Sequence, residues 1–229
     1  FSHFIKGLVK KQNPFKTGWQ GVKNEYMLLK GLFSGGSQRT KSRFTRELPQ
    51  TTAGFWASYF SNLFGFTRKV SSWGGATVSQ LEPAFLKGSK AFTLGSYIMG
   101  GSSIEADPDN VIFQHEYGHY LQSQEMGWSY LFKVAIPSLK SAAGDGMHCF
   151  FKTEQDANMR SLIYMSENVE GFYRTKDQLD KDKGWNFLKN PLDPNSERVR
   201  GRYYDVRDAS VRSDLIKSLS LTGGLWYIR

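Results

Sequence analysis

The chain has 229 residues, 39% of them hydrophobic and 15% aromatic, which is typical of a globular protein and excludes a disordered one. No apolar run approaches the roughly 20 residues that a membrane-spanning helix needs, so the sequence predicts no transmembrane segment. Cys149 is the single cysteine, which excludes an internal disulfide.

The net charge of +9 is concentrated at the start of the chain. Residues 1–46 contain ten lysines and arginines against one acid, Glu25, whereas the rest of the chain carries 20 side chains of each sign. Such a segment can contact an anionic surface, lipid or nucleic acid, or it can be a solvated basic face. We therefore expect a basic N-terminal arm, residues 1–40, followed by one domain, residues 41–229.

The first part of the chain predicts short helices. Apolar residues spaced four apart in Phe4–Lys11 indicate an amphipathic helix, and Ser34–Ser37 reads as a flexible break. A second segment runs from Ser42 and ends at Pro49. The aromatic-rich residues 51–66 are expected to pack in a core, because aromatic side chains dominate core energetics.

Two strands are expected before the central motif. Ala76–Gln80 is one, and Ala91–Met99 is the other, ended by two glycines. Gly95 inside the second strand predicts a bulge or a close approach of another backbone. Gly95, Ser96 and Tyr97 are candidates for pairing with an extended substrate backbone.

A His-Glu-x-x-His pattern lies on the next predicted helix. Asp107 is a good N-cap residue, Pro108 suits the first helical position, and Gly127 suits the position after the helix end. On a helix, His115 and His119 project from one face about 5–6 Å apart at Cβ, so both imidazoles can reach one zinc ion.

Two residues between these histidines carry further information. Glu116 lies about 100° around the helix from His115, beside the metal rather than on it, which suits a general base for a zinc-activated water. Gly118 costs about 1 kcal/mol relative to alanine in a helix, so it predicts a close approach of another backbone.

A catalytic zinc needs a third protein ligand. The metzincin pattern, with a histidine six residues after His119, fails because that position is Glu125. Glu154 is our main candidate, because it begins the next predicted helix, at Thr153, where Asp156 would complete a capping box. His148 is the alternative ligand, since imidazole binds zinc equally well.

Other side chains are candidates for supporting roles. Metal-bound histidines usually donate their second N–H to an oxygen, and Asp156 and Asn158 could accept it. A transition-state oxyanion needs a hydrogen-bond donor. The sequence offers five candidates for this donor and does not choose among them: His148, Tyr164, Tyr173, Tyr203 and Tyr204.

Several blocks, taken in order, resemble the zincin-type C-terminal domains of Bacteroidetes RHS-repeat and related polymorphic-toxin proteins. These blocks are Ser42–Thr51, Thr93–Ile98, Ala106–Pro108, Phe113–Gln124, Ile136–Leu139 and Thr153–Asn158. The resemblance covers about residues 40–165 and implies that the glutamate of Thr-Glu-x-x-Ala-Asn, Glu154, is the third ligand. It also implies a toxin or effector domain at the end of a larger secreted shell, which an immunity protein would neutralise.

The sequence thus predicts an α+β, zincin-like metallopeptidase that binds Zn²⁺ through His115, His119 and Glu154 and cleaves a protein or peptide substrate. The chain starts at Phe1 without a signal-peptide pattern, so we expect a piece excised from a larger polypeptide, and the resemblance implies that this polypeptide is secreted or delivered. Two alternatives remain open: a basic module that binds membrane or nucleic acid around a structural metal, and a protease domain that processes its own precursor.

Overall fold

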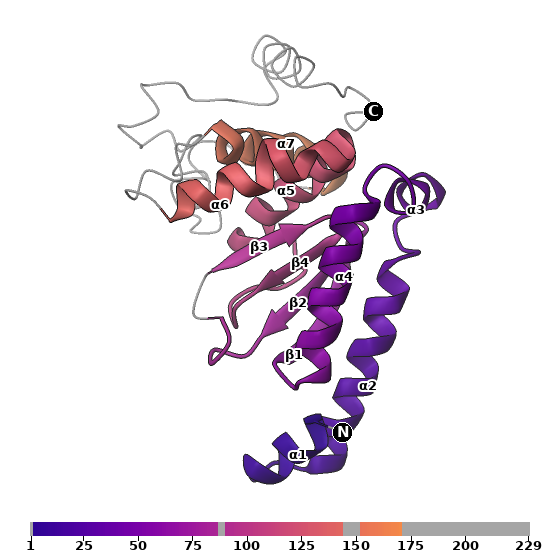
Figure 1. Ribbon diagram of the computed structural model, residues 1–229, viewed down its shortest axis with the longest axis vertical. Coiled ribbons are helices and arrows are strands. Elements are labelled where there is room, and N and C mark those ends of the chain that lie inside the picture. The colour runs from indigo at the N-terminus through magenta and orange to yellow at the C-terminus, as the bar shows by residue number, and fades with distance from the viewer. Residues whose placement is uncertain (1, 87–89, 144–151, 171–229) are drawn as a thin grey trace. The chain divides into compact units, whose positions relative to one another are not determined.

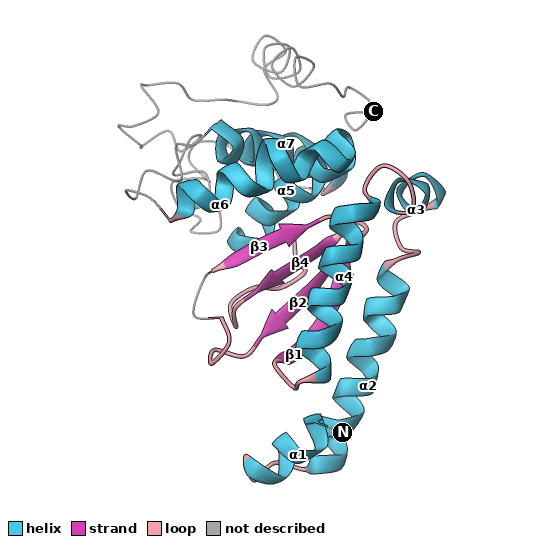
Figure 2. Cartoon of the chain, in the orientation of Figure 1, coloured by secondary structure: helices cyan, strands magenta, loops and turns pink. Residues whose placement is uncertain are grey.

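The computed structural model describes residues 2–86, 90–143 and 152–170 (Figure 1). The chain forms two compact units, Phe1–Ala106 and Asp107–Arg229. The described residues form helices and one four-stranded sheet, which confirms the α+β class (Figure 2). No helix in the described ranges combines the length and the apolar character that crossing a membrane requires.

The first unit opens with four helices. Their bounds are α1 Ser2–Val9, α2 Pro14–Gly31, α3 Ser37–Arg43 and α4 Leu48–Leu63. Asn13 caps α2 by accepting hydrogen bonds from the N–H groups of Phe15 and Lys16, and Pro14 follows it where no N–H is needed. The segment expected to end at Pro49 instead begins a helix there, because proline in the first helical turn loses no hydrogen bond.

The sheet follows the helices and has the order β1-β2-β4-β3. Its strands are β1 Thr67–Trp73, β2 Ala76–Leu81, β3 Ala91–Leu94 and β4 Tyr97–Gly100. β2 pairs antiparallel with β1 and parallel with β4, and β4 pairs antiparallel with β3. The strand predicted at Ala76–Gln80 is confirmed.

The single strand predicted at Ala91–Met99 is two strands joined by a tight turn at Gly95 and Ser96. Gly95 has a φ of 60°, which favours glycine. A Cβ at this position would also overlap the backbone of Thr51 in α4. The prediction that another backbone approaches Gly95 is therefore confirmed, but the residue marks a turn rather than a bulge.

The apolar core of the first unit joins both long helices to one face of the sheet. Leu28 of α2, Val70 of β1 and Tyr97 of β4 are buried together, and Phe55 and Tyr59 of α4 pack against them. The Tyr97 hydroxyl donates a 2.8 Å hydrogen bond to the carbonyl of Leu28. Because one side chain contacts both helices, α2 and α4 cover the same face of the sheet (Figure 2).

The basic segment is consequently part of the first unit rather than an arm beside it. Residues 2–31 include α1 and α2, and Leu28 is fully buried. The division between the two units follows Ala106, whereas we expected a division near residue 40.

A buried polar network ties the helices of the first unit together. The side-chain amide of Asn62 donates a 3.0 Å hydrogen bond to the carbonyl of Gly21, and its oxygen accepts one of 3.0 Å from Asn24. The ring of His3 lies 3.0 Å from the same oxygen. Asn24 in turn accepts a 3.0 Å hydrogen bond from the backbone N–H of Val70. Asn62 thus connects α4 to α1, α2 and, through Asn24, to the sheet.

The aromatic residues of α4 do not all face the core, contrary to the sequence-based expectation. Phe55 and Tyr59 pack partly buried against it, but Trp56, Phe60 and Phe64 are 46% to 63% exposed. The side chains that α4 buries are small or polar instead. Helical spacing predicts which residues share a face, but it does not determine which face packs inward.

The second unit is helical in its described residues. Its elements are α5 Val111–Met126, η1 Gly127–Ser129, η2 Leu131–Ala135, α6 Ile136–Ala142 and α7 Lys152–Asn168. The side chain of Asn110 caps α5 by accepting a hydrogen bond from Phe113 N–H, so the cap expected at Asp107 is wrong. Asp107 instead accepts a bond from the N–H of Asp109 and forms a turn before the helix. Gly127 ends α5 with a φ of 56°, as expected.

We predict that Asn62→Ala destabilises the first unit by about 2–4 kcal/mol, because it removes the side-chain hydrogen bonds of buried partners on α1 and α2. Thr52→Ala, on the exposed side of the same helix, should change the free energy of unfolding by less than about 0.5 kcal/mol. Chemical denaturation followed by circular dichroism measures both. Equal stabilities of the two variants would show that the network does not hold the helices together.

Candidate metal centre

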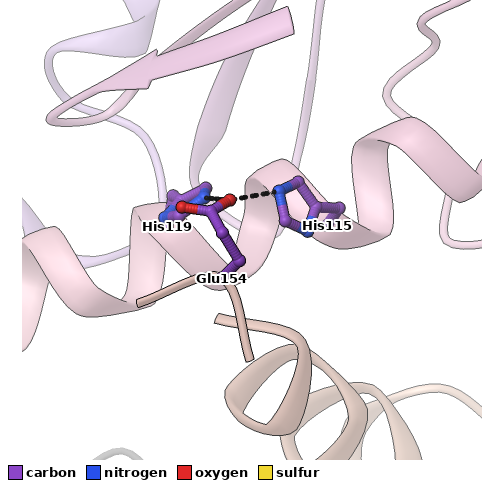
Figure 3. Close-up of side chains that lie close together, drawn as sticks. All are labelled: His115, His119 and Glu154. Carbon is purple, nitrogen blue, oxygen red and sulfur yellow. Dashed lines mark hydrogen bonds and ion pairs between the residues drawn. The ribbon is translucent and has the colours of Figure 1, made fainter. Parts of the chain in front are cut away.

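The two histidines of α5 converge on one carboxylate of α7. His115 Nε2 and His119 Nε2 each lie 3.1 Å from the same oxygen of Glu154, and the two rings are perpendicular with centroids 4.9 Å apart (Figure 3). One ligand atom from each of these residues lies within 4.8 Å of the other two. The structure therefore brings together the three ligands expected from the sequence.

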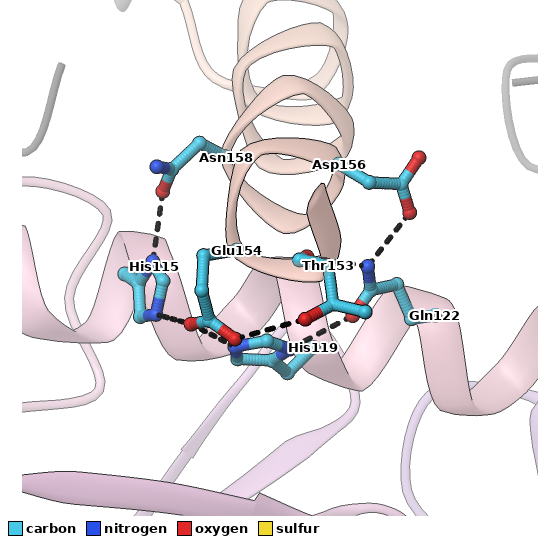
Figure 4. A network of polar contacts seen from close by, with 7 residues as sticks. All are labelled: His115, His119, Gln122, Thr153, Glu154, Asp156 and Asn158. Atoms are coloured by element: carbon cyan, nitrogen blue, oxygen red, sulfur yellow. Dashed lines mark hydrogen bonds and ion pairs between the residues drawn. The ribbon is translucent and has the colours of Figure 1, made fainter. Parts of the chain in front are cut away.

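The second ring nitrogen of each histidine faces an amide oxygen. His115 Nδ1 lies 2.8 Å from Oδ1 of Asn158, and His119 Nδ1 lies 2.8 Å from Oε1 of Gln122 (Figure 4). An amide oxygen only accepts, so Nδ1 carries the hydrogen in both rings. In the neutral imidazoles the lone pair is then on Nε2, the atom that points at Glu154.

The orientation of the Gln122 amide is fixed by its other contacts. Its nitrogen donates a 2.9 Å hydrogen bond to the carbonyl of Thr153 and one of 2.7 Å to the carboxylate of Asp156. Both partners accept only, so the oxygen of the amide must face His119 (Figure 4). The tautomer of His119 thus follows from residues at the start of α7.

Asp156 is held by a buried arginine. Arg160 Nε donates a 2.6 Å hydrogen bond to the oxygen of Asp156 that Gln122 contacts, and Arg160 also pairs with Glu125. Burial lowers the pKa of Arg160 to about 10, so the guanidinium remains charged at neutral pH. Glu125, the position of a metzincin's third histidine, therefore anchors this chain of contacts.

The expected capping box at Thr153 is wrong. Thr153 lies inside α7, and its hydroxyl donates a 3.1 Å hydrogen bond to the second carboxylate oxygen of Glu154. Asp156 was also expected to accept the second N–H of a histidine, but the oxygen that faces His119 belongs to Gln122, and Asp156 holds that amide instead. Asn158 fulfils the same expectation directly, through His115.

Charge is strongly coupled at this centre. Burial alone would lower the pKa of His115, but the hydrogen bond to Glu154 and the charges of Glu116 and Glu154 outweigh it and raise this pKa to about 9. Burial alone would raise the pKa of Glu154, but its hydrogen bonds to both histidines hold it well below the usual range. The raised pKa favours the protonated form of His115 beside the Glu154 carboxylate, and a cation bound there would take the place of that proton.

The chemistry of the donor set fits a metal ion. Once His115 loses its proton, three lone pairs converge without a hydrogen between them, and they repel one another unless a cation lies among them. Ligand atoms around one tetrahedral zinc are about 3.4 Å apart, which is close to the 3.1 Å separations here. The group His115, His119 and Glu154 could therefore hold a metal ion.

Gly118 allows the two helices to meet. A Cβ on Gly118 would overlap the backbone carbonyl of Ala157, so the backbones of α5 and α7 touch at this point. Ala157 lies between Asn158 and Asp156, the residues that support the two histidines. The close approach predicted from this mid-helix glycine is confirmed, and it sets the depth at which α7 presents Glu154.

Glu116, the expected general base, is buried on α5, with 5% of its surface exposed. The ring of Tyr164 packs against that of Tyr117, with centroids 5.1 Å apart. Four other candidates lie outside the described residues, as Cys149 does: His148, Tyr173, Tyr203 and Tyr204. Gln122 was missed in the sequence, although its position three residues after His119 is the signal that places it on the same side of the helix.

The expectation that residues 95–97 pair with a substrate backbone needs correction. Gly95 and Ser96 form the turn before β4, and Ser96 accepts a 2.7 Å hydrogen bond from Arg43. Tyr97 is fully buried and begins a strand that is paired on both sides. A strand in the middle of a sheet has no free backbone groups for a further chain, which only an edge strand offers.

Comparisons with protein-family models, with curated proteins and with solved structures find no match to this chain.

We predict that the purified chain binds about one divalent metal ion and that Glu154→Ala loses it, because a carboxylate ligand is removed. His148→Ala should retain the metal if Glu154 is the third ligand. Elemental analysis, with competition against a coloured chelator, measures both. The reverse order of affinities would transfer the ligand role to His148.

We predict that Gly118→Ala lowers metal affinity at least ten-fold, because the added methyl group pushes α7 and its Glu154 away from α5. Gly18→Ala is the matched control. A Cβ there would lie 3.6 Å from the nearest atom, in Phe4, so this variant should keep its metal and gain up to about 1 kcal/mol of stability. Unchanged metal affinity in Gly118→Ala would mean that the helix contact does not position the ligand.

Proposed function

We propose that this chain is a zinc-dependent endopeptidase, zincin-like in its catalytic unit. The observation that carries the proposal is the buried convergence of His115 Nε2, His119 Nε2 and a Glu154 oxygen. Each histidine is held from behind by its own amide oxygen, as metal-binding histidines usually are. Among the described residues this is the one group of histidines and acids with metal-binding geometry.

The donor set favours zinc over other metals. Two imidazole nitrogens suit zinc, copper, iron or nickel, whereas calcium and magnesium prefer oxygen ligands throughout. Two histidines and one glutamate form a set of three protein ligands that leaves a fourth position open, as catalytic zinc sites require. A structural zinc would be closed by a fourth protein ligand instead.

The remaining chemistry belongs to Glu116. A zinc ion in such a site supplies Lewis acidity and makes a water molecule acidic enough to lose a proton near neutral pH. The carboxylate of Glu116 follows His115 directly on α5, and its charge is close enough to raise the pKa of that histidine. Glu116 accepts the proton of the attacking water and passes it to the leaving amine.

The effector role rests on the resemblance to polymorphic-toxin domains. On that basis the chain is the toxic end of a larger secreted protein, its substrate is a protein of the target cell, and an immunity protein protects the producer. The metal centre supports the catalytic part of this proposal, because one such site is enough to cleave a protein substrate.

We predict that Glu116→Gln keeps the metal and the fold but loses peptide hydrolysis. Glutamine has nearly the same size but accepts no proton from water, and loss of a general base typically costs about 10²–10⁴ in rate. Elemental analysis, thermal unfolding and cleavage of a diverse peptide library measure the three properties. Glu105→Gln, at an exposed position, is the matched control and should retain full activity.

Two results would contradict this assignment. Loss of the metal from Glu116→Gln would make Glu116 a ligand. Full hydrolysis by the same variant would show that a residue other than Glu116 accepts the proton of the water.

A further inference from the structure

The polarity of α2 is inverted relative to an ordinary surface helix. Its fully buried residues are mostly small or polar: Gly21, Asn24, Leu28 and Gly31. Its outward residues are large and apolar, follow one another at alternating spacings of four and three residues, and are 50% to 76% exposed. They are Phe15, Trp19, Val22, Tyr26, Leu29 and, just beyond the helix, Phe33.

α4 has the same inversion. It buries residues such as Gln50, Gly54 and Ser58, and it contains no charged residue between Leu48 and Leu63. Its outward side chains, and that of the residue just after the helix, are 43% to 63% exposed. They are Leu48, Trp56, Phe60, Leu63 and Phe64. Trp56 stacks on Phe60 with ring centroids 5.4 Å apart, and Phe60 stacks on Phe64, so these three aromatic side chains form a row.

The two rows belong to one surface. Both helices pack on the same face of the sheet through the core around Leu28 and Tyr97, and they contact each other (Figures 1 and 2). Their outward sides therefore face the same way within the first unit. We call this surface, formed by the two rows, the aromatic face. An exposed apolar patch of this extent marks an interaction site.

The charges around the aromatic face select its partner. Lys16, Lys23 and Lys30 recur every seven residues, each directly after a residue of the α2 row, and all three are exposed. They belong to the segment 1–46, which carries the whole net charge of the chain. A dimer through this face would bring lysines of the two copies close together, and like charges repel. Its aromatic side chains would also fit poorly into the holes of a coiled coil.

We infer that the aromatic face binds the surface of an anionic lipid bilayer. Tryptophan and tyrosine prefer the boundary between lipid and water, phenylalanine and leucine enter the acyl region, and lysines at the rim attract acidic headgroups. The helices lie on such a surface, parallel to it, with their polar sides against the sheet. The inference is independent of the proposed peptidase activity, because the aromatic face belongs to the first unit and the metal centre to the second.

Flotation of the full chain with lipid vesicles tests the inference. The chain should float with vesicles of phosphatidylcholine and phosphatidylserine and at least ten-fold less with phosphatidylcholine alone. Added salt should weaken the binding, because it screens the lysines. Brominated lipid should quench tryptophan fluorescence in the bound state.

Matched variants locate the surface. Trp19→Gln with Trp56→Gln should lower binding at least ten-fold and remove most of the quenching, whereas Trp128→Gln, an equally exposed tryptophan of the second unit, should bind as wild type. Replacing Lys16, Lys23 and Lys30 by glutamine should weaken binding and reduce its salt dependence. The same change at the exposed Lys69, Lys133 and Lys140 removes equal charge and should have a smaller effect.

Three results would overturn the inference. Equal binding to neutral and anionic vesicles would show that charge does not select the partner. A loss of binding in Trp128→Gln as large as in the Trp19 and Trp56 variant would show that the aromatic face is not the binding surface. Absence of vesicle binding, with dimers in analytical ultracentrifugation that the Trp19 and Trp56 variants abolish, would assign the aromatic face to a second copy of the chain. All variants alter exposed side chains, so unchanged thermal unfolding checks that each one folds.

Discussion

The contact between the backbones of α5 and α7 at Gly118 is the constraint on which the candidate metal centre depends. A carboxylate can approach two histidines of another helix only if the two helix axes come close, and any side chain at position 118 would hold them apart. The cost of glycine in mid-helix is thus offset by what the contact allows. Glu154 reaches both Nε2 atoms, and Asn158, one turn later on α7, reaches His115 from behind.

The contacts that support His119 form a chain of hydrogen bonds, in which each side chain orients the next. Arg160 holds Asp156, Asp156 and the carbonyl of Thr153 hold the Gln122 amide, and Gln122 holds His119. Each member has a single acceptable orientation, because each partner is only a donor or only an acceptor. The centre is therefore organised before any metal binds, and its histidines do not need to reorient. What a metal must do is displace the proton that the raised pKa favours on His115 beside Glu154.

The sequence predicted that His115, His119 and Glu154 lie together, and the histidine pair was the easiest part because its spacing is local. His115 and His119 lie on one helix, so the 3.6-residue period alone places them together, and Glu154 followed from the start of the next helix and from the resemblance. The network behind them depends on the rotation of α7 against α5, which no local pattern encodes. For the same reason the sequence assigned Asp156 to a helix cap and missed Gln122. Glycines were informative, because Gly95 and Gly118 each indicated a backbone contact that the structure contains.

The inverted helices show where pattern reasoning about a core fails. An amphipathic period has two faces, and the usual rule assigns the apolar one to the interior. In the first unit Asn24 and Asn62 hydrogen-bond to each other, and they also bond to the sheet and to the carbonyl of Gly21. The buried amides on the polar sides of α2 and α4 therefore have hydrogen-bond partners. The glycines and serines beside them let the helices come close. The apolar sides then remain outside, where they form the aromatic face.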